Sequence, residues 1–133
     1  MRNRTPRVVI NPDEDGSPDV RNYSLTVELL RAIGRNLVID LERSTPKKEP
    51  SQMLTAYGAR LMELTKVRGI ASIEVGRFSV TIKRFPAFGW ETIQPHIIDI
   101  LATCFEDPAN VQAIDRTVKG EYDYGVLKDF MTS

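Results

Sequence analysis

Thiol and imidazole side chains, which hold structural zinc and iron–sulfur clusters or serve in nucleophilic catalysis, occur once each in this sequence of 133 residues: Cys104 and His96. Both fall in a segment predicted to be one helix, where eight residues span about 12 Å, too far for them to share a metal ion. A four-thiolate iron–sulfur site needs four cysteines, and structural zinc needs four cysteine or histidine ligands. Two copies of the chain could supply four ligands only if Cys104 were exposed. The sequence therefore predicts neither a metal site nor a cofactor.

Catalytic motifs are also missing from the sequence. It contains no G-x-S-x-G, no P-loop and no G-x-G-x-x-G. His96 has no sequence-signalled serine or cysteine partner, and Asp99, three residues on, would only orient it or hydrogen-bond to it. Cys104 falls in the apolar stripe of its helix, which predicts a small buried side chain, whereas His96 falls on the solvated face. We therefore predict that the protein is not an enzyme.

The composition is that of an ordinary soluble domain, with 41% apolar and 27% charged residues. Eighteen basic residues balance eighteen acidic ones, so the overall charge favours neither nucleic acid nor an anionic membrane as a partner. The apolar runs are too short to cross a membrane, and the first residues do not resemble a secretory signal. A single cysteine fits a reducing compartment, which predicts a cytoplasmic location.

The segment with the most function-like composition is KRFPAFGW at residues 83–90, which places aromatic side chains beside cations. Apolar loop tips often mark partner surfaces. The alternative is that Phe85 and Trp90 cover the end of the core, which would leave Phe88 as the more exposed ring. The aromatic and acidic C-terminal tail also has two interpretations: docking on another protein or on a second copy of the chain, or packing on its own domain. The candidate interaction residues are Lys83, Arg84, Phe85, Phe88, Trp90, Tyr122, Tyr124 and Phe130.

A β-hairpin is predicted immediately before this loop, at residues 70–83. Two stretches of alternating hydrophobicity flank Gly76 and Arg77, which suggests a two-residue type II′ turn. All the apolar side chains then fall on one face of the hairpin. The register pairs three residues of one strand with three of the other: Val75 with Phe78, Ile73 with Val80, and Ala71 with Ile82.

Three helices are predicted around this hairpin. The first begins after Ser51 as N-cap and ends near Val67, with Gly58 marking a close approach of its backbone to the sheet. The second begins at Thr92 as N-cap, which places Pro95 in its first turn. A third short helix starts at Asp107-Pro108 and runs to about residue 118. Their apolar stripes consist of Leu54, Tyr57, Leu61 and Leu64 in the first helix and Ile93, Ile97, Ile100, Leu101 and Cys104 in the second.

The first 41 residues are less clearly patterned. Residues 23–33 fit both a strand and a helix, and we favour a strand that forms a hairpin with residues 37–39. Residues 1–20 form a lead-in whose only strand-like part is Val8-Val9-Ile10, either an added edge strand or disordered. The expected architecture is a two-layer α+β domain at residues 21–105, ββαββα, with a mostly antiparallel sheet covered by helices on one face. Residues 106–133 form a C-terminal extension with a short helix.

Residues 61–101 contain a helix end, a glycine-centred turn, a strand, a tryptophan and a proline-containing helix, in that order. This pattern resembles the N-terminal domain of Nfu/NifU-type iron–sulfur scaffold proteins, and a weaker likeness extends it to residues 21–105. The sequence differs from the family at 84–89, where an acidic stretch is usual, and it shows no cluster-binding domain with a C-x-x-C pair. The matching segments are LMEL at 61–64, RGI at 68–70, GRFSVTIK at 76–83, Trp90, and IQPHI at 93–97.

The resemblance implies a fold and a class of partner but no scaffold activity, because that activity belongs to the domain with the C-x-x-C pair. It predicts a protein-interaction module that contacts iron–sulfur assembly factors or cluster-receiving clients. The alternative is a nucleic-acid-associated module that uses the loop from Lys83 to Trp90. The sequence disfavours it, because residues 68–75 lack the aromatics that stack on bases in RNA-recognition domains.

Overall fold

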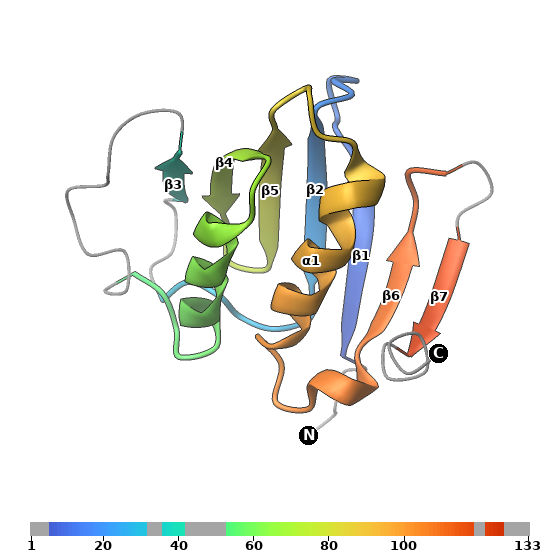
Figure 1. Cartoon of the computed structure of the whole chain (residues 1–133). Coiled ribbons are helices and arrows are strands. Elements are labelled where there is room, and N and C mark those ends of the chain that lie inside the picture. Colours follow the sequence, from blue (N-terminus) through green and yellow to red (C-terminus); the bar gives the residue numbers. More distant parts are fainter. Residues whose placement is uncertain (1–5, 32–35, 42–52, 119–121, 127–133) are drawn as a thin grey trace.

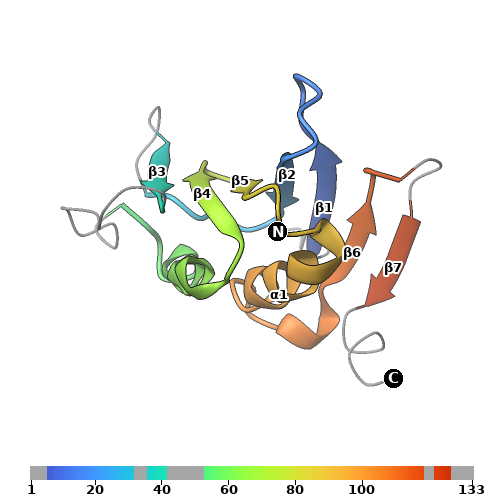
Figure 2. The same cartoon turned by 45° about the horizontal axis from the view of Figure 1, so that its top comes forward.

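A computed structural model of the chain describes residues 6–31, 36–41, 53–118 and 122–126, the last of these as backbone only. The fold is α+β, with one mostly antiparallel sheet and helices on one of its faces, as predicted (Figures 1 and 2). The strands are β1 (Arg7–Pro12), β2 (Val20–Leu25), β3 (Leu37–Asp40), β4 (Ile70–Val75), β5 (Ser79–Arg84), β6 (Gln112–Asp115) and β7 (Tyr122–Val126). The helices are the 3₁₀ helix η2 (Gly58–Lys66), the α-helix α1 (Trp90–Ala102) and the short 3₁₀ helix η3 (Pro108–Asn110).

The seven strands lie in the order β3-β4-β5-β2-β1-β6-β7, and only the pair β1–β6 is parallel. The core lies between the sheet and the two longer helices, where Tyr23, Ile82 and Ile97 are among the fully buried side chains. In the described ranges, no helix has the length and apolar character that a membrane span requires.

The predicted lead-in contains an interior strand rather than an edge strand or a disordered segment. β1 lies between β2 and β6, and its Val8 and Ile10 are completely buried while Val9 between them is half-buried. This alternation places two aliphatic side chains in the core. Residues 7–12 of the predicted lead-in therefore belong to the same sheet as the other described strands.

β2 confirms the preferred strand interpretation of residues 23–25, but the predicted hairpin with residues 37–39 is wrong. β3 pairs with β4, with Ile39 opposite Ile73, whereas β2 pairs with β1 and β5. The segment after β2 continues into the core through Leu29 and Leu30, so the chain reaches β3 at the far side of β4. The first residues of the predicted turn lie outside the described residues.

The β4–β5 hairpin forms where predicted, but its register differs by two residues. Val75 faces Val80 rather than Phe78, and the three-residue connection at 76–78 closes with a 2.7 Å hydrogen bond from the Gly76 N–H to the Ser79 carbonyl. Because side chains alternate with period two, Val80 and Ile82 still face the core. Phe78 does not, and its side chain is 41% exposed.

The segment after β2 accounts for this longer connection. The Leu25 N–H donates to the Phe78 carbonyl at 2.8 Å, and the Leu29 N–H donates to the Arg77 carbonyl at 2.7 Å. These two bonds hold the connection open against residues that are distant in sequence. A two-residue turn would have used the connection's backbone groups locally.

η2 is shorter than predicted and is a 3₁₀ helix, and the predicted N-cap at Ser51 lies outside the described residues. Leu54 precedes the helix and bridges to Leu30, and Tyr57 is 39% exposed rather than buried. Leu61 and Leu64 are buried, as expected.

Gly58 marks a close approach, but to the chain after β2 rather than to a sheet strand. A Cβ added there would lie 2.1 Å from the Leu29 carbonyl oxygen. The Thr55 hydroxyl fixes this junction, because it accepts the Gly58 N–H at 2.9 Å and donates to the Glu28 carbonyl at 2.8 Å. The first residue of η2 is therefore held directly against the segment that follows β2.

α1 begins one turn earlier than predicted, with Gly89 rather than Thr92 as its N-cap. The Gly89 carbonyl accepts hydrogen bonds from the N–H groups of Thr92 and Ile93, so Thr92 is already helical. Pro95 therefore lies inside the helix, where it removes one backbone hydrogen bond. The buried face includes Gln94 and Ile98 as well as most of the predicted stripe, whereas Ile100 is only half-buried.

The described residues of the C-terminal extension form two strands in place of the predicted helix to about residue 118. Asp107 and Pro108 do start a helix, but η3 has only three residues. Val111, Ala113 and Asp115 are then buried in alternation, and β6 pairs in parallel with β1. Residues that local signals assigned to a helix thus form a strand along the edge of β1 that does not pair with β2. β7 then adds a further strand beside β6.

Candidate functional site

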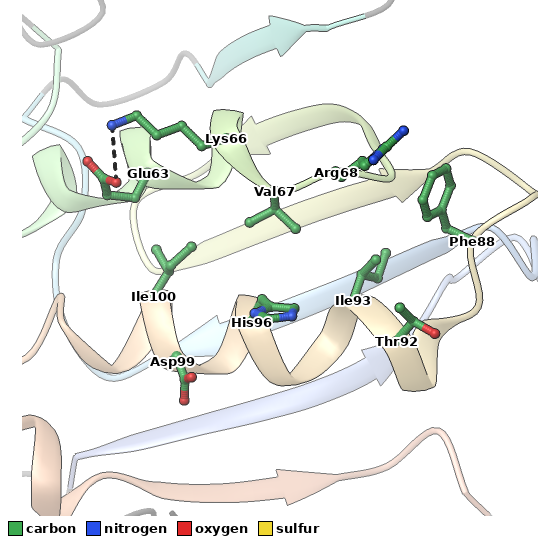
Figure 3. A pocket seen from close by; sticks show the side chains of 10 residues that line it. All are labelled: Glu63, Lys66, Val67, Arg68, Phe88, Thr92, Ile93, His96, Asp99 and Ile100. Carbon is green, nitrogen blue, oxygen red and sulfur yellow. Dashed lines mark ion pairs between the residues drawn. The ribbon is translucent and has the colours of Figure 1, made fainter.

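An open groove of about 480 Å³ runs between η2 and α1 on the helical face of the molecule (Figure 3). Its floor is apolar, made by Val67 at the end of η2 and by Ile93 and Ile100 on α1, and Phe88 lies at one end. This size falls in the range of small-molecule pockets. The lining residues are Glu63, Lys66, Val67, Arg68, Phe88, Thr92, Ile93, His96, Asp99 and Ile100.

Charged side chains line the rim of the groove. Lys66 Nζ lies 3.4 Å from Glu63 Oε1, and both side chains are well exposed. Arg68 and Asp99, also exposed, form no ion pair with any residue that the structure describes. The groove thus has an apolar floor and two uncompensated rim charges of opposite sign.

The Phe88 end of the groove is built on Gly69. Gly69 has a φ of +106°, and a Cβ there would lie 2.8 Å from Phe88 Cγ and 3.0 Å from Ile93 Cγ2. A turn fixes the loop, since the Phe85 N–H donates to the Gly69 carbonyl at 2.8 Å and the Phe88 N–H donates to the Phe85 carbonyl at 3.0 Å. The absent side chain at Gly69 therefore lets the Phe88 ring pack onto the chain beside Arg68.

The loop after β5 does present an aromatic side chain to solvent, but not the expected one. Phe85 is 37% exposed, and Lys83 is exposed at the end of β5. Phe88, predicted to be the more exposed ring, is half-buried and packs against the core and the groove. The prediction was wrong because it did not include Gly69, which receives the Phe88 ring.

Trp90 and Arg84, two of the predicted interaction residues, make contacts within the domain instead. Trp90 is buried, and its indole N–H donates to the Pro18 carbonyl at 2.8 Å. The guanidinium carbons of Arg21 and Arg84 lie 4.8 and 5.4 Å from the centroid of its ring. Arg84 also pairs with Asp19 at 3.1 Å, so these residues hold the β1–β2 connection to the start of α1.

The predicted residues of the C-terminal tail are only partly described. Tyr122 and Tyr124 lie on β7, for which the structure describes the backbone alone, and Phe130 lies outside the described residues. Their proposed contact with another protein or a second copy therefore stays a prediction.

A buried polar network next to α1 was not anticipated from the sequence. Gln94 Oε1 accepts 2.8 Å hydrogen bonds from Arg21 Nη1 and from the Tyr23 hydroxyl. Gln94 Nε2 donates to Asp115 Oδ2 at 3.5 Å, and Asp115 Oδ1 accepts the Thr117 N–H at 2.8 Å. One signal was available, because Gln94 falls on the same helical face as Ile97, Ile98 and Leu101.

Cys104 and His96, the two reactive side chains singled out in the sequence, lie in different surroundings. Cys104 is buried as predicted, and burial raises the pKa of its thiol from 9.0 to about 12, so the nucleophilic thiolate is disfavoured. His96 is exposed on α1 as predicted, and it lines the groove. Among the residues described, no three His, Cys, Asp or Glu side chains are close enough to hold a metal ion.

The sequence comparisons found no related family. No protein-family model matches this chain, and no curated protein matches it. Among solved structures, the chain is similar to the crystal structure of protein SAV1430 from Staphylococcus aureus, with 15% sequence identity and a TM-score of 0.48. The alignment covers 71% of this chain and 92% of that one. A likeness this distant carries no functional argument, so the groove is interpreted from its own chemistry.

Proposed function

We propose that this protein is a non-catalytic module that binds another protein through its helical face. The docking surface consists of the groove between η2 and α1 together with Phe85, whose backbone is hydrogen-bonded to Gly69 and Phe88 at one end of the groove. Lys83 alternates with the buried Ile82 and therefore belongs to the open face of the sheet. The observation that carries the proposal is the exposed Phe85 ring beside an open groove with an apolar floor. Exposed apolar side chains that adjoin a concave surface are a feature of protein-binding sites.

The resemblance to the N-terminal domain of Nfu/NifU-type scaffold proteins supports a particular class of partner. The segment that carries the resemblance, residues 61–101, folds as η2, β4, β5 and α1, in the order that the resemblance implies. The partner we propose is therefore an iron–sulfur assembly factor or a protein that receives clusters. The cytoplasmic location predicted from the single cysteine stays a prediction.

The nucleic-acid alternative has less support from the described residues. The open face of strands β1–β6 carries small polar side chains, such as Asn22 and Thr81, which hydrogen-bond to each other at 2.8 Å. Aromatic stacking platforms are absent from that face in these six strands. Arg84, one of the cations expected to contact phosphates, is paired with Asp19 instead.

A comparison of two exposed phenylalanines tests the proposed function. Phe85 and Phe78 have similar exposure, 37% and 41%, but they lie just beyond opposite ends of β5. Tagged wild-type protein, the Phe85→Ser variant and the Phe78→Ser control are used to capture proteins from a lysate of the source cells. Captured proteins are identified by mass spectrometry, and circular dichroism confirms that all three chains are folded.

The proposal expects the wild type and Phe78→Ser to capture an iron–sulfur assembly factor or cluster-containing client that Phe85→Ser captures at least about fivefold less, the effect of an interface residue worth 1 kcal/mol or more. Capture of no such protein would refute the partner class. Equal capture by all three chains would refute the docking surface.

A further inference from the structure

The groove between η2 and α1 has chemically different ends (Figure 3). Arg68 lies at the end closed by the Phe88 ring, and Asp99 lies at the other end, beside Ile100. Neither side chain is paired with a described residue, and the nearby Lys66 and Glu63 offset each other. The occupant that fits this groove therefore carries a negative charge at one end and a positive charge at the other.

The apolar floor limits the length of that occupant. Ile93 and Ile100 are seven residues apart on α1, a rise of about 10 Å. An extended chain advances about 3.3 Å per residue, so two side chains separated by one residue can both rest on a floor of this length. Residues on either side of them point the opposite way, toward the rim, where Arg68 and Asp99 are exposed.

We propose that the groove binds an extended peptide segment of the partner protein with a basic residue, two aliphatic residues separated by one position, and an acidic residue. The aliphatic side chains rest on Val67, Ile93 and Ile100. The acidic residue pairs with Arg68 and the basic residue pairs with Asp99. This inference rests on the proposed function, and it specifies the peptide chemistry that the docking surface recognises.

Other occupants fit the rim less well. A small anion would have only Arg68 as an unpaired cation, with Glu63 and Asp99 on the same rim. A purely aliphatic ligand would cover the floor but leave both rim charges unpaired as it displaced water from them. A peptide with aliphatic side chains and charges of both signs covers the apolar floor and pairs with both rim charges.

A titration with a designed peptide tests the proposal. The probe is a capped pentapeptide of lysine, leucine, alanine, leucine and glutamate, added to ¹⁵N-labelled protein and followed by amide chemical shifts. The expected shifts are at Ile93, His96 and Asp99, with a dissociation constant below about 1 mM. No shifts in roughly 5 mM peptide, or shifts confined to the open face of the sheet, would refute the proposal.

A charge exchange tests the pairing with Arg68. The Arg68→Glu variant should bind the probe about tenfold more weakly, because an attraction is replaced by a repulsion of similar size. A second peptide, with lysine in place of the glutamate, should recover that loss on the variant. A Glu74→Arg control on the open sheet face should bind the probe like the wild type. Unchanged affinity of Arg68→Glu, or no recovery with the second peptide, would refute the pairing.

Two further outcomes separate this inference from the proposed function. If the probe binds as expected but no iron–sulfur protein is captured, the peptide chemistry stands and the partner class fails. If an iron–sulfur protein is captured equally by the wild type and Arg68→Glu, the partner class stands and this groove is not its site. Dimers that form without peptide and dissociate in Arg68→Glu would assign the groove to a second copy of this chain.

Discussion

The two flanks of α1 differ in how their polar groups are satisfied. On the flank toward β1 and β6, Gln94 joins Arg21, Tyr23 and Asp115 in a buried network. On the flank toward η2, the exposed His96 and the half-buried Ile100 line an open groove, and the exposed Asp99 lies on its rim. One helix therefore has a closed flank that attaches it to the sheet and an open flank that is available to a partner.

Because of this difference, substitutions on one flank of α1 should change stability, and substitutions on the other flank should change binding. Changes on the closed flank leave buried polar groups or cavities, so they should lower the free energy of unfolding. Changes on the open flank alter side chains that already contact water, so they should affect binding alone.

The largest expected effect is that of Trp90→Ala. The variant loses a buried ring, its hydrogen bond to Pro18 and its contacts with Arg21 and Arg84. Deleting a buried aromatic side chain costs about 3–5 kcal/mol. Urea unfolding followed by far-ultraviolet circular dichroism measures this loss. A loss below about 1 kcal/mol would mean that the buried Trp90 ring does not stabilise the start of α1.

The next effect is that of Gln94→Leu on the polar network. The change removes both hydrogen bonds that Gln94 Oε1 accepts and leaves Asp115 Oδ2 without its Gln94 partner, and a buried unsatisfied group costs about 1–3 kcal/mol. Urea unfolding should show a loss of about 1–3 kcal/mol. The control is Thr92→Leu, an exposed residue on the groove side, which should remain within about 0.5 kcal/mol of the wild type. Equal losses in both variants would remove the distinction between the flanks.

Alkaline pH should weaken the fold through Cys104, which lies just beyond the end of α1. Its folded pKa of about 12 exceeds the unfolded value of 9.0, so the stability of its buried neutral thiol is fully present below pH 9. This stability is lost as pH rises from 9 toward 12, by at most about 1.4 kcal/mol per pH unit. Urea unfolding between pH 8 and 11 should show a steeper loss in the wild type than in Cys104→Ala. Equal slopes would show that the thiol is not protected by burial.

The smallest expected effect on stability is that of the rim charges. Arg68→Glu and Asp99→Lys should each change the free energy of unfolding by less than about 0.5 kcal/mol, because both side chains are exposed and unpaired with described residues. Thermal unfolding of both variants checks this expectation. A loss above about 1 kcal/mol in either one would assign its charge to the fold rather than to a partner.

Local sequence patterns predicted the elements of residues 61–102 well. Hydrophobic alternation identified β4 and β5, and helical periodicity identified α1. Partner choice and register were less predictable, because they depend on backbone groups of distant residues. Leu25 and Leu29 bind the carbonyls of the β4–β5 connection, and no local pattern around Gly76 contains that information.

The C-terminal region shows a competition between local and tertiary signals. Asp107 and Pro108 start a helix, but the alternation from Val111 to Asp115 matches the free edge of β1 and forms β6 instead. The strand has only four residues, so its alternation is a weaker local signal than the helix start at Asp107 and Pro108.

The candidate site was only partly predictable from the sequence. The loop after β5 was identified from its composition, and Phe85 and Lys83 are exposed there. The groove was not identified, because Arg68 and Asp99 become neighbours of one cavity only when η2 and α1 pack side by side. Phe85 rather than Phe88 is the more exposed ring because Phe88 packs into the space beside Gly69. Hydrophobic periodicity does not reveal that space.

Photo-crosslinking from the two faces of the molecule tests most directly whether the open flank of α1 meets a partner. A photoreactive amino acid replaces His96 in the groove or, in a second chain, Glu74 on the open sheet face, and adducts formed in cells are identified by mass spectrometry. The account predicts adducts to an iron–sulfur assembly factor or client from position 96 and none to that protein from position 74. Such adducts from position 74 alone, or from neither position, would contradict it.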